Sequence, residues 1–137
     1  MMADQLDYFF NPRGVAVIGA SADPSKLSYG VVRNLKEHGY QGAIYPINPK
    51  GGEILDLPVL PDITAVPDPI DLAIIMVRAP LAPEALEACG KRGLKVAIVV
   101  TGGFREAGKE GAALEQSLKT IADRYGRRRV MLVGLAL

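Results

Sequence analysis

Short apolar segments recur along the chain at intervals of roughly 25–30 residues, which is the spacing of repeated strand–helix units. Five can be delineated: Val15–Gly19, Ala43–Ile47, Asp71–Val77, Lys95–Val100 and Arg129–Gly134. They are mostly continuous apolar runs without polar alternation, a pattern typical of parallel strands that helices cover on both faces. The sequence therefore predicts a parallel sheet before any single motif is considered.

Three segments with helical periodicity lie between these predicted strands: Tyr29–His38, Pro83–Arg92 and Glu110–Tyr125. A glycine follows each of them, and glycine is favoured as a left-handed helix C-cap. The segment 51–69 differs, because it contains four prolines and only short apolar pieces. We interpret it as an irregular crossover with room for one short helix.

Strands that alternate with helices favour right-handed crossovers and an open parallel sheet. We therefore predict an α/β fold with a doubly wound parallel sheet, Rossmann-like, in three αβα layers, with residues 1–137 as a single domain. Such sheets bind ligands at the carboxyl ends of their strands, where the strand order reverses. The residues that follow each predicted strand are thus the candidate site.

Charge and cysteine content exclude several kinds of partner. The formal net charge is +1, so nothing points to nucleic acid or an anionic membrane surface. The apolar runs are too short to span a bilayer, and Met1–Phe10 lacks a signal-peptide pattern. A lone cysteine, Cys89, excludes an intrachain disulfide and fits a reducing compartment, so we expect a cytoplasmic protein. No residue group has metal-ligand spacing, and a homo-oligomer stays open.

The loop after the first strand, Gly19-Ala20-Ser21, consists of small residues. Such a turn lets backbone N–H groups approach an anion, and the helix that follows adds its positive dipole. Ser21 can donate a hydroxyl hydrogen bond. The sequence does not match the glycine fingerprint of dinucleotide sites, so a merely connecting turn remains an alternative.

Lys50 follows the second strand, in the sequence Asn48-Pro49-Lys50. An NAD site has an acidic side chain near this position for the ribose hydroxyls, whereas a lysine suits a phosphate on the ribose. This indicates an adenine nucleotide with a phosphorylated ribose, either coenzyme A (CoA) or NADP. A solvated turn lysine is the alternative.

The third and fourth strands end in further candidates. The third strand is followed by Arg78-Ala79-Pro80, which interrupts the regular structure. Backbone groups at this interruption have room to contact an adenine or a pantetheine chain. Arg78 is either a phosphate partner or a surface cation. After the fourth strand, Gly102 and Gly103 in Thr101-Gly102-Gly103 allow a ligand to approach closely, or form only a flexible turn.

Three other features are not assigned a function. His38 ends a predicted helix, where the dipole favours an imidazole, and is not expected to be catalytic. Cys89 falls on the apolar face of its helix and is expected in the core. Arg127-Arg128-Arg129 is too short for a nucleic-acid patch. No catalytic residue is predicted in this chain.

Several motifs, in order, resemble the CoA-binding domain of ADP-forming acyl-CoA (acetyl-CoA) synthetases, which is shared with the succinyl-CoA synthetase alpha subunit. They are Pro12–Ser21, Gly39–Lys50, Val66–Ile75 and Thr101–Gly108. The resemblance implies that the loop at Ser21 contacts CoA, that Lys50 meets the phosphorylated adenosine end, and that Val100-Thr101-Gly102 borders the ligand. It also implies a partner ligase domain or subunit, in which an acyl phosphate is made for the CoA thiol to attack.

The chain departs from that family at two places. Arg78 stands where the family usually has proline, and Leu135-Ala136-Leu137 replaces the usual Gly-Pro-Asn after the last strand. The phosphorylated histidine of the family belongs to a later domain, which His38 does not match. We therefore expect a CoA-binding part of an acid–CoA ligase that has no turnover by itself. The alternatives are a stand-alone CoA-binding protein, which the stretch Ser28-Tyr29-Gly30 and Arg78 resemble, and an NADP-binding domain.

Overall fold

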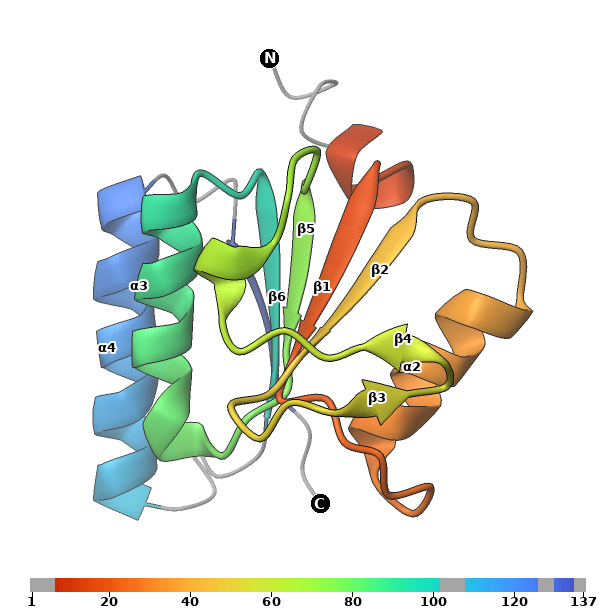
Figure 1. Ribbon diagram of the computed structural model, residues 1–137. Coiled ribbons are helices and arrows are strands. Elements are labelled where there is room, and N and C mark those ends of the chain that lie inside the picture. The colour runs from red at the N-terminus through yellow and green to blue at the C-terminus, as the bar shows by residue number, and fades with distance from the viewer. Residues whose placement is uncertain (1–6, 102–107, 126–129, 135–137) are drawn as a thin grey trace.

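Five parallel strands form the main sheet of the computed structural model, which describes residues 7–101, 108–125 and 130–134 (Figure 1). The strands are β1 (Gly14–Ile18), β2 (Ala43–Ile47), β5 (Leu72–Ile75), β6 (Val96–Thr101) and β7 (Val130–Gly134). Their order across the sheet is β2-β1-β5-β6-β7, and each neighbouring pair is parallel. The doubly wound α/β fold is thus confirmed.

Among the described residues, three α-helices cover the two faces of this sheet. They are α2 (Leu27–Glu37), α3 (Ala82–Arg92) and α4 (Gly108–Tyr125). Figure 1 shows α3 and α4 together on one face and α2 on the other. Each helix lies within two residues of its predicted bounds, and α2 and α3 end before the predicted glycines, Gly39 and Gly93. The glycine after α4 lies outside the described residues.

Alternation along β1 separates two buried clusters, one on each face. Val15 and Val17 pack with Val32 of α2, whereas Ala16 packs with Leu86 and Cys89 of α3. Ala16 also begins a row of small residues across the sheet, because it pairs with Ala73 of β5, which pairs with Ala97 of β6. These methyl groups leave room for α3 to pack closely.

The segment after β2 is more ordered than the sequence predicts. It contains a hairpin of β3 (Glu53–Ile54) and β4 (Leu57–Pro58), and a short 3₁₀ helix, η1 (Ile63–Ala65). The hairpin was missed because Leu55 and Asp56 form its turn with positive φ angles of 50° and 68°, where glycine or asparagine is the usual signal. The short helix was expected. After the hairpin, the Leu60 N–H donates to Pro46 and covers the free edge of β2.

An ion pair with a fully buried carboxylate ties β1 to β5 at their amino ends. The Asp71 side chain is fully buried, and it accepts hydrogen bonds from the Arg13 backbone N–H (2.9 Å), Nε (2.9 Å) and Nη2 (2.7 Å). These hydrogen bonds with Arg13 hold the pKa of Asp71 below its usual range. The predicted strand began at Asp71, but this residue serves as a side-chain anchor at the end opposite the candidate site.

No helix among the described residues is long and apolar enough to cross a bilayer.

Candidate functional site

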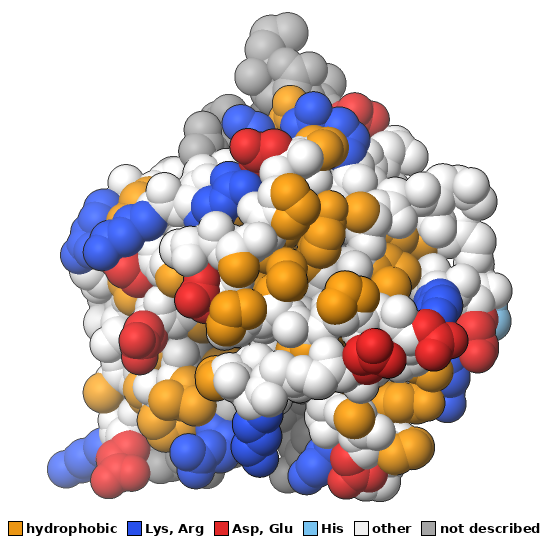
Figure 2. Space-filling view, viewed as in Figure 1, with side chains coloured by type: hydrophobic (Ala, Val, Ile, Leu, Met, Phe, Trp, Pro, Cys, Tyr) orange, Lys and Arg blue, Asp and Glu red, His pale blue; other side chains and the backbone are white. Residues whose placement is uncertain are grey.

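The strand order reverses between β1 and β5, and the loops after β1, β2 and β5 meet there. The N–H groups of Gly19 (3.0 Å) and Ala20 (3.2 Å) both donate to the carbonyl of Ile47, at the end of β2. On the other side, the Met76 N–H after β5 donates to Ile18 (2.8 Å). Parallel sheets bind ligands at this position. In Figure 2, Lys and Arg side chains lie along the lower edge of the molecule.

Gly19 is required at the reversal for two reasons. Its φ is +89°, and a Cβ at this position would lie 2.4 Å from the Met76 carbonyl oxygen. A side chain would therefore separate the β1 loop from β5. Since the N–H groups of Gly19 and Ala20 are already used by Ile47, and the Ala20 side chain is buried, this predicted pair shapes the loop and does not aim N–H groups at a ligand.

Ser21 and Asp23 organise the rest of this loop. The Ser21 Oγ accepts a hydrogen bond from the Asp23 N–H (3.0 Å), which leaves the Ser21 hydroxyl hydrogen to donate. The Asp23 carboxylate accepts from the backbone N–H (2.9 Å) and hydroxyl (2.8 Å) of Ser25, and these bonds lower the pKa of Asp23. The side chain of Lys26, the N-cap residue of α2, makes no capping hydrogen bond. The N–H groups of the first turn of α2 have no acceptor within the helix, and groups of this kind can bind an anion.

Lys50 lies in a tight turn that begins at Asn48. The Gly51 N–H donates to the Asn48 carbonyl (3.0 Å), with Pro49 and Lys50 at the two central positions. Asparagine, proline and glycine at these positions match the preferences of a type I turn. The Asn48 side chain accepts from the Lys50 N–H (2.9 Å) and donates to the Ala20 carbonyl (2.9 Å). The turn of Lys50 is thereby joined directly to the β1 loop, and the Lys50 side chain is exposed.

The third loop enters a 3₁₀ helix, η2 (Ala79–Leu81), at Arg78. Arg78 and Pro80 are exposed and can meet a ligand, whereas the Ala79 side chain is buried in the core next to α3. Of this predicted trio, Ala79 can therefore contribute only backbone groups.

The loop after β6 lies outside the described residues, which end at Thr101 before it. Val100 is half-buried, and Thr101 is the last residue of β6, opposite Gly134 of β7. Gly102 and Gly103 lie outside the described residues, so their predicted approach to a ligand stays a prediction.

Sequence reasoning missed three residues in the loops and helix starts that follow β1, β2 and β5. Asn48 was treated only as a neighbour of Lys50. Leu27 and Leu81 are 53% and 44% exposed, unusual for leucine, and each lies at a helix that follows β1 or β5. Position would have identified them, because each stands shortly after a predicted strand end.

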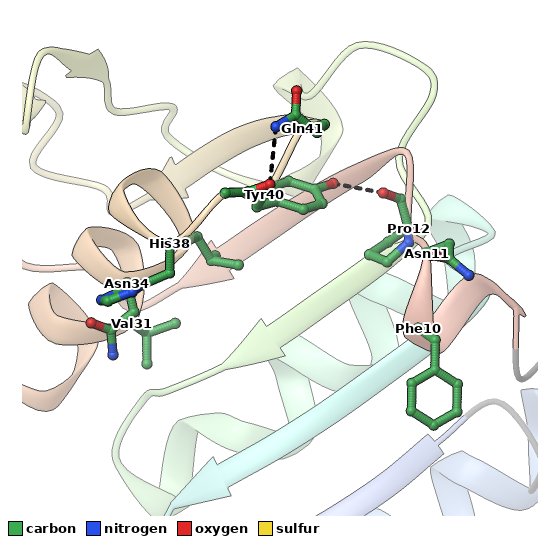
Figure 3. Close-up of a pocket in the computed structure, with 11 residues that line it drawn as sticks. Phe10, Asn11, Pro12, Val31, Asn34, His38, Tyr40 and Gln41 are labelled. Carbon is green, nitrogen blue, oxygen red and sulfur yellow. Dashed lines mark hydrogen bonds between the residues drawn. The ribbon is translucent and has the colours of Figure 1, made fainter.

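A separate cavity of about 730 Å³ lies at the opposite end of the sheet (Figure 3). It is lined by Phe10, Val31 and His38, among others, and by Tyr40, whose hydroxyl donates to the Pro12 carbonyl (2.8 Å). The carbonyl end of α2 points to it, and no lysine or arginine is among the described residues that line it. A helix carboxyl end disfavours anions, so this cavity does not suit a phosphorylated ligand despite its volume.

Cys89 is 1% exposed, and burial raises its thiol pKa to about 12. A protonated, enclosed thiol is not a nucleophile, so the expected core role is confirmed. His38 is exposed at the end of α2, beside the cavity of Figure 3 and away from the candidate site. No group of potential metal ligands occurs within the described part of the chain.

Comparison with known proteins gives consistent results. The family model described as CoA binding domain matches residues 13–133. The ADP-forming acetate–CoA ligase I subunit alpha of Pyrococcus furiosus is 46% identical over 127 residues, 90% of this chain. The chain spans only 28% of that relative's length.

Two solved structures are also similar. The apo form of the dinucleotide forming acetyl-coenzyme A synthetase 1 of Ca. Korarchaeum cryptofilum superposes with a TM-score of 0.84 at 40% identity, covering 94% of this chain and 27% of that one. A hypothetical protein from Pyrococcus horikoshii OT3 gives a TM-score of 0.67 at 28% identity, covering 98% of this chain and 84% of that one.

Proposed function

Since this chain belongs to the family of CoA-binding domains, we propose that the crevice between β1 and β5 holds CoA, with its phosphorylated adenosine end at Lys50. The observation that carries this proposal is the direct link between the Lys50 turn and the β1 loop through Asn48. It sets an exposed cation next to the loop that leads into the N-terminus of α2. Both features favour phosphate groups.

The other predicted residues have distinct roles in this arrangement. Gly19 and Ala20 keep the loop close to β2 and β5, and Ser21 supplies a hydroxyl donor. Arg78 offers a second cation across the crevice, with Ala79 and Pro80 as backbone and surface contacts. Val100, Thr101 and Gly102 would border the far side of the ligand. In this proposal CoA is a substrate: it enters as the free thiol and leaves as an acyl thioester.

Titration calorimetry of the purified chain with CoA, NAD and NADP tests the proposal. We expect CoA to bind more tightly than NAD, because an NAD site requires an acidic partner for its ribose hydroxyls, where this chain has Lys50. Equal or tighter binding of NAD would contradict the proposal. Equal binding of NADP would favour the alternative of an NADP-binding domain.

The proposal extends to the whole reaction. We infer that the chain serves as the CoA-binding part of an ADP-forming acid–CoA ligase, since it covers about a quarter of the ligases it resembles. The CoA sulfur would attack the acyl carbon of an acyl phosphate made in a partner domain or subunit. The sulfur–acyl bond forms as phosphate leaves, and the thiol proton is lost to the medium.

A domain exchange tests this extension. The matched 127 residues of the Pyrococcus furiosus alpha subunit would be replaced by this chain, and acetyl-CoA formation from acetate, ATP and CoA measured with the full enzyme. We expect turnover by the chimera and none by the isolated chain. Turnover by the isolated chain would contradict the inference. A chimera that binds CoA without forming thioester would favour a stand-alone CoA-binding protein, as the similar extent of the Pyrococcus horikoshii structure would suit.

A further inference from the structure

Asn48 is the residue through which the first two loops of the crevice are joined. Its Nδ2 donates to the Ala20 carbonyl, and its Oδ1 accepts from the Lys50 N–H, each at 2.9 Å. Its backbone N–H donates to Leu60 (3.0 Å), which fixes the residue against the segment after β4. The half-buried carboxamide thus has both of its polar atoms engaged, one on each loop.

Only a carboxamide of this length makes both contacts. An aspartate keeps the acceptor for the Lys50 N–H but has no hydrogen to donate to Ala20. A serine also keeps the turn, because its hydroxyl replaces an asparagine at the first turn position, but it does not reach the second loop. The turn and the bridge can therefore be separated by substitution.

Resting on the proposed function, we propose that Asn48 is a positioning residue that makes the site selective for a phosphorylated ribose. It holds the backbone of Lys50 at a fixed place relative to the β1 loop, so that the lysine reaches the ribose phosphate while the loop holds the rest of the nucleotide. Without the bridge, the Lys50 turn is still formed but is no longer tied to the β1 loop. The lysine charge is then not aimed at one phosphate.

The test compares CoA with dephospho-CoA, which lacks the ribose phosphate, by titration calorimetry on wild type, Lys50→Ala, Asn48→Ser and the double variant. A charge-assisted contact predicts that wild type prefers CoA by about tenfold to a hundredfold. Lys50→Ala should bring the preference close to one. Asn48→Ser should lower the preference for CoA over dephospho-CoA nearly as much as Lys50→Ala does. The double variant should have the same preference as Lys50→Ala, because both changes remove the same contact.

A purely structural role gives a different result. Asn48→Ser would then weaken CoA and dephospho-CoA equally and leave the preference unchanged, which would overturn the inference. Asn34→Ser, on the exposed surface of α2, is the matched control and should retain the wild-type preference. If Asn48→Ser does not fold by circular dichroism, Asn48→Thr replaces it with the same expected loss, because threonine keeps a hydroxyl at the first turn position and adds no charge beside Lys50. A wild-type chain without preference would instead contradict the placement of the phosphate at Lys50, and with it the inference.

Discussion

At the scale of single residues, the positions that shape the crevice are constrained by backbone contacts more than by side-chain chemistry. Gly19 illustrates this, since its missing side chain allows the Met76 carbonyl to approach. The Lys50 side chain is exposed, yet its backbone N–H is held by the Asn48 side chain. Residues that we propose to contact CoA and residues that hold the loops in place are therefore interleaved along the same short segments.

Gly19→Ala should be strongly destabilising. The positive φ alone costs an alanine about 1–2 kcal/mol, and overlap with the Met76 carbonyl adds to this. We expect a lower free energy of unfolding by urea denaturation and weaker CoA binding. Gly30→Ala is the control, because Gly30 lies inside α2 with free space around it, and alanine there should stabilise by about 1 kcal/mol. Equal effects of the two substitutions would contradict this interpretation.

At the scale of elements, the hairpin β3–β4 completes the edge of the sheet that carries Lys50. Lys36 of α2 donates to the Leu55 carbonyl in its turn, and buried Ile54 and Val59 anchor it on the α2 side of the sheet. A two-residue turn with positive φ at both positions is the type I′ turn, which fits the twist of paired strands. The packing of the hairpin thus overrides an unfavourable turn sequence.

Substitutions at Asp56 test that override. Asp56→Ala should be less stable than Asp56→Gly by about 1 kcal/mol, because a left-handed conformation penalises a Cβ. The exposed α4 residue Ala112 offers the reverse control, since Ala112→Gly should destabilise by about 1 kcal/mol. Chemical denaturation measures both differences. If alanine and glycine are equivalent at position 56, the turn does not hold this conformation in solution.

At the scale of the whole molecule, the two ends of the parallel sheet have different chemistry. The carboxyl end carries the exposed cations Lys50 and Arg78 on its loops, whereas at the amino end Arg13 holds the buried carboxylate of Asp71. The centroid of the Tyr8 ring lies 5.8 Å from the Arg13 Cζ and 5.8 Å from the Lys95 Nζ, so both cations lie against this ring at the amino end. A ligand that binds at one end leaves the anchor at the other end intact, so binding and stability can be changed separately.

The contribution of the Arg13–Asp71 ion pair to the free energy of unfolding should decrease in acid. The folded pKa of Asp71 is depressed, so its contribution is present above the unfolded value of about 3.9 and is lost as the pH falls through the folded pKa. At pH 7, Asp71→Asn should lower the free energy of unfolding by roughly 1.5–3 kcal/mol, the range for hydrogen bonds to a charged group. The difference between wild type and variant should narrow below about pH 4. Urea denaturation from pH 3 to 7 measures it, with exposed Glu84→Gln as control; a difference independent of pH would contradict the assignment.

The sequence by itself determined the five strands of the main sheet, the three helices that cover it, and the end of the sheet at which we propose the site. Continuous apolar runs are favoured as buried parallel strands, and a glycine after a helix favours its termination, so these features follow from local patterns. The positions of Ser21, Lys50 and Arg78 after their strands followed from the same alternation.

Only the tertiary structure decided how those positions meet. The order β2-β1-β5 brings together loops far apart in the sequence, gives the Gly19 and Ala20 N–H groups to Ile47, and buries Asp71 against a partner 58 residues away. The hairpin turn at Leu55-Asp56 and the bridge through Asn48 have the same origin. Such contacts depend on strand pairing and packing across the chain, which no local pattern of residues encodes.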